Sequence, residues 1–326
     1  MNFQETYFLV GGAGFIGSHF TDFLLSRPET KALTIYDNFS SGRDWHVAHH
    51  AKDKRFKIVK GDVNQIEKMT TAMHGHDVVM HFASNPDIAA AAKDPDIDFR
   101  EGTVLTRNIC EAMRVSGAKR ILYCSGSGVY GDLGNMDLKE DYGPMVPIST
   151  YGASKLAGEG LIASYCFMFD KTACAFRFAN VVGPRQTHGV GFDFARRLRQ
   201  DPSKLTILGD GSQSKSYVYV EDIVAAVTTA NWNVKTRFEA FNVGTGDYIT
   251  VAEIADISLK ALGLSPETTK LEFTGGNRGW KGDVPVIRLN SDKIRKLGWK
   301  NKKTAAQAML AAIEAMLPEI ESGRIT

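Results

Sequence analysis

A tyrosine and a lysine are four residues apart in the stretch YGASK, at Tyr151 and Lys155. On a helix this spacing places both side chains on one face, one turn apart. A neighbouring ammonium favours the phenolate and lowers the pKa of a tyrosine. Tyr151 could then exchange a proton with a substrate hydroxyl. YxxxK alone is more often an ordinary pair on a helix surface, so this interpretation depends on what the rest of the chain supplies.

A second candidate is the stretch CSGSGVYG, residues 124–131, which follows the apolar run Arg120–Tyr123 of a predicted buried strand. A hydroxyl opposite Tyr151 would hydrogen-bond the reacting oxygen and hold it in line. We favour Ser125 over Ser127 because it occupies the last inward position of the strand. Either serine could instead only satisfy backbone groups at the strand end.

Glycines follow the first predicted strand with the spacing GxxGxxG, at Gly11, Gly14 and Gly17. Glycine is required where a turn needs positive φ, where the backbone approaches a pyrophosphate, and where a helix packs closely on a strand. An amphipathic helix follows, so its N-terminus would face the anion, near Phe15 and Ile16. A structural glycine-rich turn is the less favoured alternative.

The second predicted strand ends at Asp37, twenty residues after Gly17. A carboxylate there can accept both hydroxyls of an adenosine ribose and would repel a 2′-phosphate. Arg43 is the only cation nearby, so the sequence favours NAD over NADP. The positive nicotinamide ring would add to the effect of Lys155 and exchange a hydride at the carbon whose hydroxyl Tyr151 deprotonates.

Polar residues also follow the third and fourth predicted strands. Asp62 could lie near the adenine or could equally cap the helix that starts near Asn64. Phe82-Ala83-Ser84 ends the fourth strand at the same edge, whereas His81 is interpreted as a structural histidine.

These residues depend on strands that alternate with segments of helix length. The apolar runs indicate βα units and a parallel sheet buried on both faces, with ligands bound beyond the carboxyl ends of the strands. The predicted strands are 7–10, 32–36, 56–59, 78–82, 120–124 and 173–178.

The composition limits the kinds of partner that the protein is expected to bind. The 326 residues include 39 basic and 37 acidic ones without a long block of either sign, which gives no indication of a nucleic-acid groove or a membrane-binding patch. The four cysteines share no metal-ligand spacing, so we expect reduced core thiols, no disulfide and no metal. No apolar run approaches a membrane span and no signal peptide is recognisable, so we expect a cytoplasmic protein that acts on a small molecule.

Eight motifs in order, GGAGFIGSH, DNFSSG, GDV, HFAS, SGSGVYG, YGASK, RFANVVGP and NVGTG, resemble the extended short-chain dehydrogenase/reductases. The resemblance is to the nucleotide-sugar epimerases and dehydratases related to UDP-galactose 4-epimerase, and it covers roughly residues 7–300. It implies an α/β fold: a Rossmann-type doubly wound parallel sheet with a smaller α/β substrate-binding domain. The expected division is 1–180 and 181–326, with segments near 217–245 returning to the first domain. A homodimer is expected through helices around 98–115 and 150–168.

The resemblance also assigns roles. Tyr151 matches the catalytic base, and Lys155 the lysine that contacts the nicotinamide ribose. Many members carry Ser or Thr at the position of Gly126, but CSGSGVYG resembles a glycine-rich version that places the hydroxyl at Ser125. The further residues expected to contact NAD are Asn38, Ser41, Gly42, Asp62, Val63, Phe82, Ala83 and Ser84.

The substrate motifs depart from the family pattern. Asn180 matches a residue that contacts the diphosphate sugar, but Lys215 replaces an arginine that clamps the diphosphate and loses its bidentate geometry. A second phosphate-binding arginine is displaced to Arg278, with Lys281 as a substitute. Lys215 and Arg278 could also be solvated loop charges. Ile287 occupies a position that restricts N-acetyl groups in some relatives, so N-acetylhexosamines are not excluded.

The reaction type follows from an absence. Related 4,6-dehydratases carry an Asp-Glu pair where this chain has Gly and Ser, so a ketone formed at C4 has no local route to elimination. The hydride would return to the same carbon, which makes the chain a 4-epimerase of a UDP-sugar: UDP-glucose or UDP-galactose, or an N-acetylhexosamine or uronate analogue. The alternatives are a dehydratase or another keto-sugar-forming enzyme, and a non-catalytic NAD-binding regulatory protein.

Overall fold

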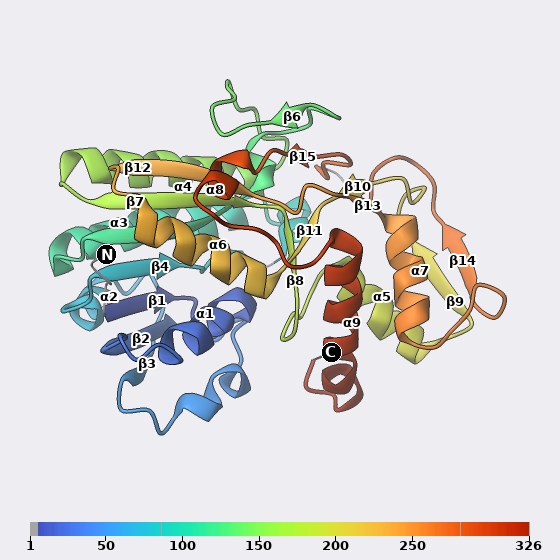
Figure 1. Ribbon diagram of the computed structural model, residues 1–326, viewed down its shortest axis with the longest axis horizontal. Coiled ribbons are helices and arrows are strands. Elements are labelled where there is room, and N and C mark those ends of the chain that lie inside the picture. The colour runs from blue at the N-terminus through green and yellow to red at the C-terminus, as the bar shows by residue number, and fades with distance from the viewer. Residues whose placement is uncertain (1–5, 86, 281, 326) are drawn as a thin grey trace.

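A seven-stranded parallel sheet forms the larger part of the molecule in the computed structural model, which describes residues 6–85, 87–280 and 282–325 (Figure 1). The strand order is β12-β7-β5-β4-β1-β2-β3, so the chain runs outward from β1 in one direction and then crosses to the other side. The strands are β1 (Thr6–Val10), β2 (Ala32–Asp37), β3 (Phe56–Lys60), β4 (Val78–His81), β5 (Arg120–Gly126), β7 (Thr172–Phe178) and β12 (Phe238–Val243). All six predicted strands are confirmed, with ends shifted by at most two residues.

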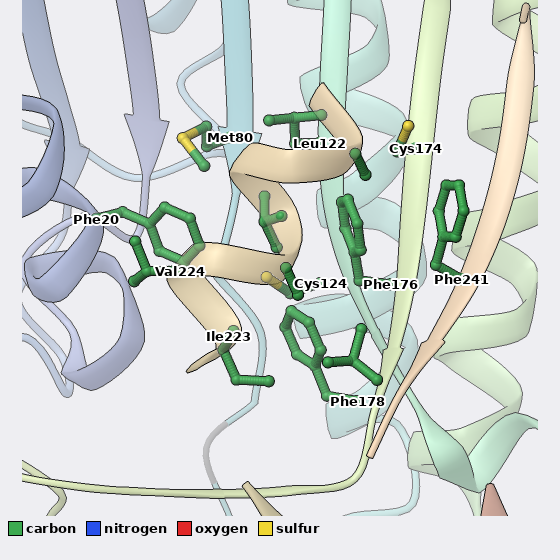
Figure 2. Close-up of a cluster of buried hydrophobic side chains, with 14 of the residues drawn as sticks. Phe20, Met80, Leu122, Cys124, Cys174, Phe176, Phe178, Ile223, Val224 and Phe241 are labelled. Atoms are coloured by element: carbon green, nitrogen blue, oxygen red, sulfur yellow. The ribbon is translucent and has the colours of Figure 1, made fainter. Parts of the chain in front are cut away.

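Alternate strand residues point to opposite faces of this sheet, and each face is covered by helices. One core cluster joins β1 residues Tyr7 and Leu9 to α1 (Phe15–Leu25) and α6 (Val220–Asn233), which contact one another. The other joins Phe8 and Val10 to α2 (Ile66–Met73), α3 (Leu105–Ser116) and α4 (Thr150–Met168). Figure 2 shows the first cluster, with Phe20, Ile223 and Val224 against the sheet residues Met80, Leu122, Cys124, Phe176 and Phe178.

The second part of the molecule has its own core and lies to the right of the sheet in Figure 1. Its helices are α5 (Val190–Gln200), α7 (Val251–Ala261) and α9 (Ala305–Glu321). Capping boxes at Thr250 and Thr304 fix where α7 and α9 begin. Four two-stranded sheets lie outside the large sheet: β8 (Asn180–Val182) with β11 (Tyr217–Tyr219), β9 (Lys204–Ile207) with β14 (Lys270–Phe273), β10 (Ser214–Lys215) with β13 (Ile249–Thr250), and β6 (Asp137–Leu138) with β15 (Arg288–Leu289). The short helix α8 (Asp292–Lys296) packs near β12.

The chain passes between the two parts more than once. After β11, helix α6 packs against α1, and β12 then pairs with β7 at the edge of the large sheet. No described helix is long and apolar enough to cross a membrane.

Candidate active site

One large cavity of about 740 Å³ runs along the carboxyl edge of the sheet and continues between the sheet and the second part of the molecule. Of the predicted site residues that the structure describes, all but Gly42 and Arg278 line it. Those that line it are Gly11, Gly14, Phe15, Ile16, Gly17, Asp37, Asn38, Ser41, Asp62, Val63, Phe82, Ala83, Ser84, Ser125, Ser127, Tyr151, Lys155, Asn180, Lys215 and Ile287.

The glycine-rich turn after β1 lines the cavity and packs closely on neighbouring backbone. Gly11 has φ of +80°, and a Cβ added there would lie 2.7 Å from the Ala83 nitrogen. A Cβ on Gly17 would lie 2.4 Å from the Gly11 oxygen, so the start of α1 must pack directly on the turn. No side chain caps α1, whose N-cap is Gly14 and whose first turn carries no acidic residue. Its free N–H groups at the cavity wall suit an anionic diphosphate.

Asp37 lies buried at the end of β2 with both oxygens already holding the turn together. Oδ2 accepts from the Ala13 N–H at 2.9 Å, and Oδ1 accepts from the Phe39 N–H at 2.8 Å. Burial raises the pKa of Asp37, and these two N–H groups oppose the rise. Each carboxylate oxygen keeps a lone pair for a ribose hydroxyl. Gly42 packs behind this carboxylate: a Cβ there would lie 3.0 Å from Asp37 Oδ1.

The two interpretations of Asp62 are resolved only in part. Its Oδ1 accepts from the Asn64 N–H at 2.8 Å, which closes a turn, but the N-cap of α2 is Gln65. Asp62 also lines the cavity. His81 does not line it: it is buried, and its Nε2 lies 2.9 Å from Thr106 Oγ1, which agrees with a structural histidine.

Helix α4 presents Tyr151 and Lys155 to the cavity, and Ser149 caps its start by accepting from the Gly152 N–H at 3.1 Å. The Lys155 Nζ lies 5.4 Å from the centroid of the Tyr151 ring and donates to the Cys124 carbonyl at 2.9 Å. Burial acts to lower the pKa of Lys155, but the neighbouring Tyr151 and Tyr123 raise it above its ordinary value. The lysine is therefore a fixed, buried ammonium beside the tyrosine.

The two serines at the end of β5 differ in their partners. Ser125 Oγ donates its only proton to Glu159 Oε1 at 2.6 Å, in a buried contact. Ser127 begins the 3₁₀ turn η5 (Ser127–Val129) and lines the cavity, and its hydroxyl makes no hydrogen bond with the residues that the structure describes. This geometry favours Ser127 as the hydroxyl that can donate to a ligand, against the sequence-based preference for Ser125.

The cations predicted for the substrate are already paired. Lys215 Nζ lies 2.5 Å from Asp283 Oδ1 within the cavity wall. Arg278 lies outside the lining: it donates to Asp132 Oδ2 at 2.5 Å and to the Asp283 carbonyl, so it holds its loop to the segment after β5. Lys281 lies outside the described residues.

Sequence reasoning missed a buried network behind the site. Glu159 lies one turn after Lys155. Its carboxylate accepts a hydrogen bond from the Ser125 hydroxyl and forms an ion pair with Arg177 at 2.8 Å. Arg177 in turn donates to the Tyr130 hydroxyl at 2.8 Å, which fixes the loop after β5. The position of Glu159 at four residues from Lys155 was the available signal, because it predicts the same helix face.

Two further contacts were missed. His46 Nδ1 donates to the Ala13 carbonyl at 2.8 Å and so supports the glycine-rich turn. Gln186 and His188, from the loop after β8, line the substrate end of the cavity. Nothing in their local sequence distinguishes them from loop residues.

Comparison with known proteins decides the family. Residues 7–244 match the family described as NAD dependent epimerase/dehydratase. The chain belongs to this family. The uncapped α1 terminus, the glycine turn and the Asp37 carboxylate on the cavity wall fit NAD, with the diphosphate at α1 and a ribose at Asp37.

Individual family members match nearly the whole chain. The UDP-glucose 4-epimerase of Mycolicibacterium smegmatis is 30% identical over 313 residues, which cover 94% of this chain and 96% of that protein. A crystal structure of a UDP-galactose 4-epimerase is 35% identical, with a TM-score of 0.85 over 96% of this chain and 99% of that one. The UDP-glucose 4-epimerase of Thermus thermophilus, solved in complex with NAD, is 27% identical with a TM-score of 0.83, covering 95% of this chain and 98% of that one.

Proposed function

We propose that this chain is an NAD-dependent isomerase that inverts C4 of a UDP-sugar through a transient 4-keto sugar. The observation that carries the proposal is the pair Tyr151 and Lys155 on the wall of a cavity whose other end fits NAD. The similarity to UDP-glucose 4-epimerases over nearly the full chain supports the same reaction.

Tyr151 is the base in this proposal. Its phenolate takes the proton of the C4 hydroxyl, and the Lys155 ammonium stabilises the negative oxygen at short range. NAD held at the start of α1 and at Asp37 would supply the acceptor for the C4 hydride and the donor for its return. The keto sugar must turn over in the cavity between these transfers, and Tyr151 then gives the proton back to the C4 oxygen. Both the hydride and the proton removed at C4 are thus returned, so the reaction causes no net oxidation of the sugar.

Ser127 completes the proposed catalytic group by donating to the C4 oxygen, because its hydroxyl is uncommitted among the described residues. Ser125 instead orients the strand end through Glu159. Gly126 and Ser127 occupy the positions where related dehydratases carry two carboxylates, so this strand end lacks the acid and base for removing water.

Three residues are proposed to bind the rest of the substrate. Asn180 and Lys215 lie on the cavity wall where a diphosphate can reach them, and Lys215 supplies the charge. Ile287 lines the same end and is buried. Arg278 acts indirectly, since it holds the loop that carries Asp283.

A homodimer is proposed through α3 and α4. Large apolar side chains are exposed on and beside these helices, among them Phe99 (59% exposed), Phe167 (65%) and Met168 (71%). Exposed apolar groups gathered on two adjacent helices are typical of a protein interface. We also propose the domain division 1–180 and 181–326, since the second part has its own core, and a cytoplasmic location, since the four cysteines are buried free thiols.

The test is incubation of the purified protein with UDP-galactose, UDP-N-acetylglucosamine and UDP-glucuronate, with products followed by NMR. The proposal expects C4-inverted product from at least one of them. Release of water or carbon dioxide without inversion would identify another keto-sugar-forming enzyme. Bound NAD with no turnover of any substrate would indicate a regulatory protein instead.

A further inference from the structure

Three side chains of the types that bind metal ions lie close together outside the active-site cavity. Asp22 lies on α1, and His49 and His50 lie on the short 3₁₀ turn η2 (Ala48–His50), in the blue segment below α1 in Figure 1. His49 Nε2 and His50 Nε2 lie 2.8 and 2.7 Å from the same oxygen, Asp22 Oδ1. One ligand atom from each of the three residues lies within 4.8 Å of the others.

From this arrangement we propose that Asp22, His49 and His50 form a binding site for a zinc ion. Two imidazole nitrogens and one carboxylate oxygen are donors that Zn²⁺ prefers, whereas Mg²⁺ and Ca²⁺ require mostly oxygen ligands. Three protein ligands leave a fourth, open position for water or an anion. Sequence reasoning did not identify this site, because Asp22 is far from the histidine pair along the chain.

Arg185 supplies a second, independent observation. Its Nη2 lies 2.8 Å from Asp22 Oδ2 and so fixes the carboxylate through that oxygen. Oδ1 accepts from the two imidazole Nε2–H groups, and the ion would replace these two protons as it binds. Its Nη1 is buried and has no hydrogen-bond partner among the described residues. Since both nitrogens belong to one guanidinium, the orphaned donor lies beside the cluster and can bind the water or anion in the open position.

The charges of the site set its strength. Asp22 and Arg185 cancel one another, so the ion meets a nearly neutral ligand set of two imidazoles and one shared carboxylate. We therefore expect micromolar binding rather than the tighter binding of an anionic thiolate site.

The site lies between segments of the two parts of the molecule, outside the cavity lining. Asp22 belongs to the helix that follows the glycine turn, η2 follows the loop after Asp37, and Arg185 precedes the cavity residues Gln186 and His188. The Arg185 N–H also contacts Glu319 of α9. Zinc would thus hold segments of both parts together and stabilise the fold, without entering the chemistry at Tyr151.

The experiment titrates chelator-treated full-length protein with ZnCl₂ by calorimetry and counts bound metal by mass spectrometry. We expect one zinc ion per chain and, at saturation, a rise in Tm of a few degrees. Co²⁺ in place of zinc should give the visible absorption of a four-coordinate site. Mg²⁺ should cause neither change.

His50→Gln and Asp22→Asn should each weaken zinc binding at least tenfold and remove the Co²⁺ band, while His74→Gln, at an exposed histidine outside the cluster, should retain both. Circular dichroism confirms that each variant is folded, and His49→Gln provides a third variant. Absence of stoichiometric zinc binding, or equal binding by the His50, Asp22 and His74 variants, would overturn the proposal. Epimerase turnover is not a readout of this test, so its outcome is independent of the proposed reaction.

Discussion

The cofactor half and the substrate half of the cavity are built differently. The cofactor half is built mostly from backbone groups: the glycine turn, the uncapped start of α1, and the Ala13 and Phe39 N–H groups that hold Asp37. The substrate half uses long-range side-chain pairs, such as Lys215 with Asp283, which are 68 residues apart. In the proposed function, Lys215 would exchange its contact with Asp283 for a contact with the substrate, whereas Asp37 would keep its two N–H partners.

This difference suits an epimerase. A rigid cofactor half keeps NAD in place through both transfers, while a substrate half held by exchangeable pairs lets the keto sugar turn over. Lys155 marks the boundary: it is fixed by the Cys124 carbonyl on one side and faces Tyr151 on the other.

Removing the chemistry at this boundary should have the largest effect. Tyr151→Phe deletes the proposed base, and we expect kcat to fall about 10³-fold while NAD remains bound, since general base catalysis contributes roughly 10²–10⁴-fold. The control is Tyr165→Phe, on the same helix but hydrogen-bonded to Glu111. Turnover by the Tyr151 variant at the wild-type rate would refute the assignment.

The second-largest effect is expected from adding a side chain to the glycine turn of the cofactor half. Gly17→Ala places a Cβ against the Gly11 and Gly12 backbone, so we expect the affinity for NAD to fall about tenfold or more and Tm to drop. Gly160→Ala, at an exposed position of α4 with nothing within 4 Å of the added Cβ in the single chain, should leave NAD binding unchanged and raise the stability of the monomer by about 0.5–1 kcal/mol. Fluorescence titration with NADH and thermal unfolding measure both effects.

Breaking the pair in the substrate half should change KM alone. Lys215→Met removes the proposed phosphate contact, and we expect KM for the UDP-sugar to rise about tenfold at unchanged NAD affinity. Asp283→Asn releases the lysine from its partner and should lower KM. If both variants had the KM of the wild type, the ion pair between Lys215 and Asp283 would have only a structural role.

The two serines provide a finer comparison. Ser127→Ala should lower kcat about tenfold by removing one hydrogen bond to the reacting oxygen. Ser125→Ala should change kcat less and instead lower the free energy of unfolding by about 1 kcal/mol, because Glu159 loses a donor but keeps Arg177. If Ser125→Ala lowered kcat more than Ser127→Ala, Ser125 would be the hydroxyl that contacts the reacting oxygen.

The last prediction concerns the pH dependence of stability and does not involve turnover. Burial lowers the pKa of His46 to about 4, so this histidine stays neutral in the native state while the unfolded chain takes up a proton below about pH 6.5. The native state is then destabilised progressively as pH falls from about 6.5 to 4, by on the order of 3 kcal/mol. Denaturant unfolding should show a shallower pH dependence in His46→Gln than in the wild type or in His74→Gln. An identical slope in all three would contradict the assignment.

The same contrast explains what could be predicted from the sequence. The βα alternation predicted the strands correctly, because alternation is a local property of the sequence. The glycine spacing and Asp37 predicted residues that the structure places on the cavity wall, and their contact with NAD stays a prediction. The direction of Arg278 and the partner of Lys215 could not be predicted, since each depends on a loop packed far along the chain. The acceptor of the Ser125 proton could not be predicted for the same reason, because Glu159 lies on another element.

The most direct test of the central claim is the fate of a deuterium placed at C4 of UDP-galactose, followed by NMR in H₂O. We predict UDP-glucose that retains the label at C4, because the hydrogen removed from C4 returns to the same carbon. Product that has lost the label to solvent, or that carries it at C6 after loss of water, would contradict the proposed epimerisation.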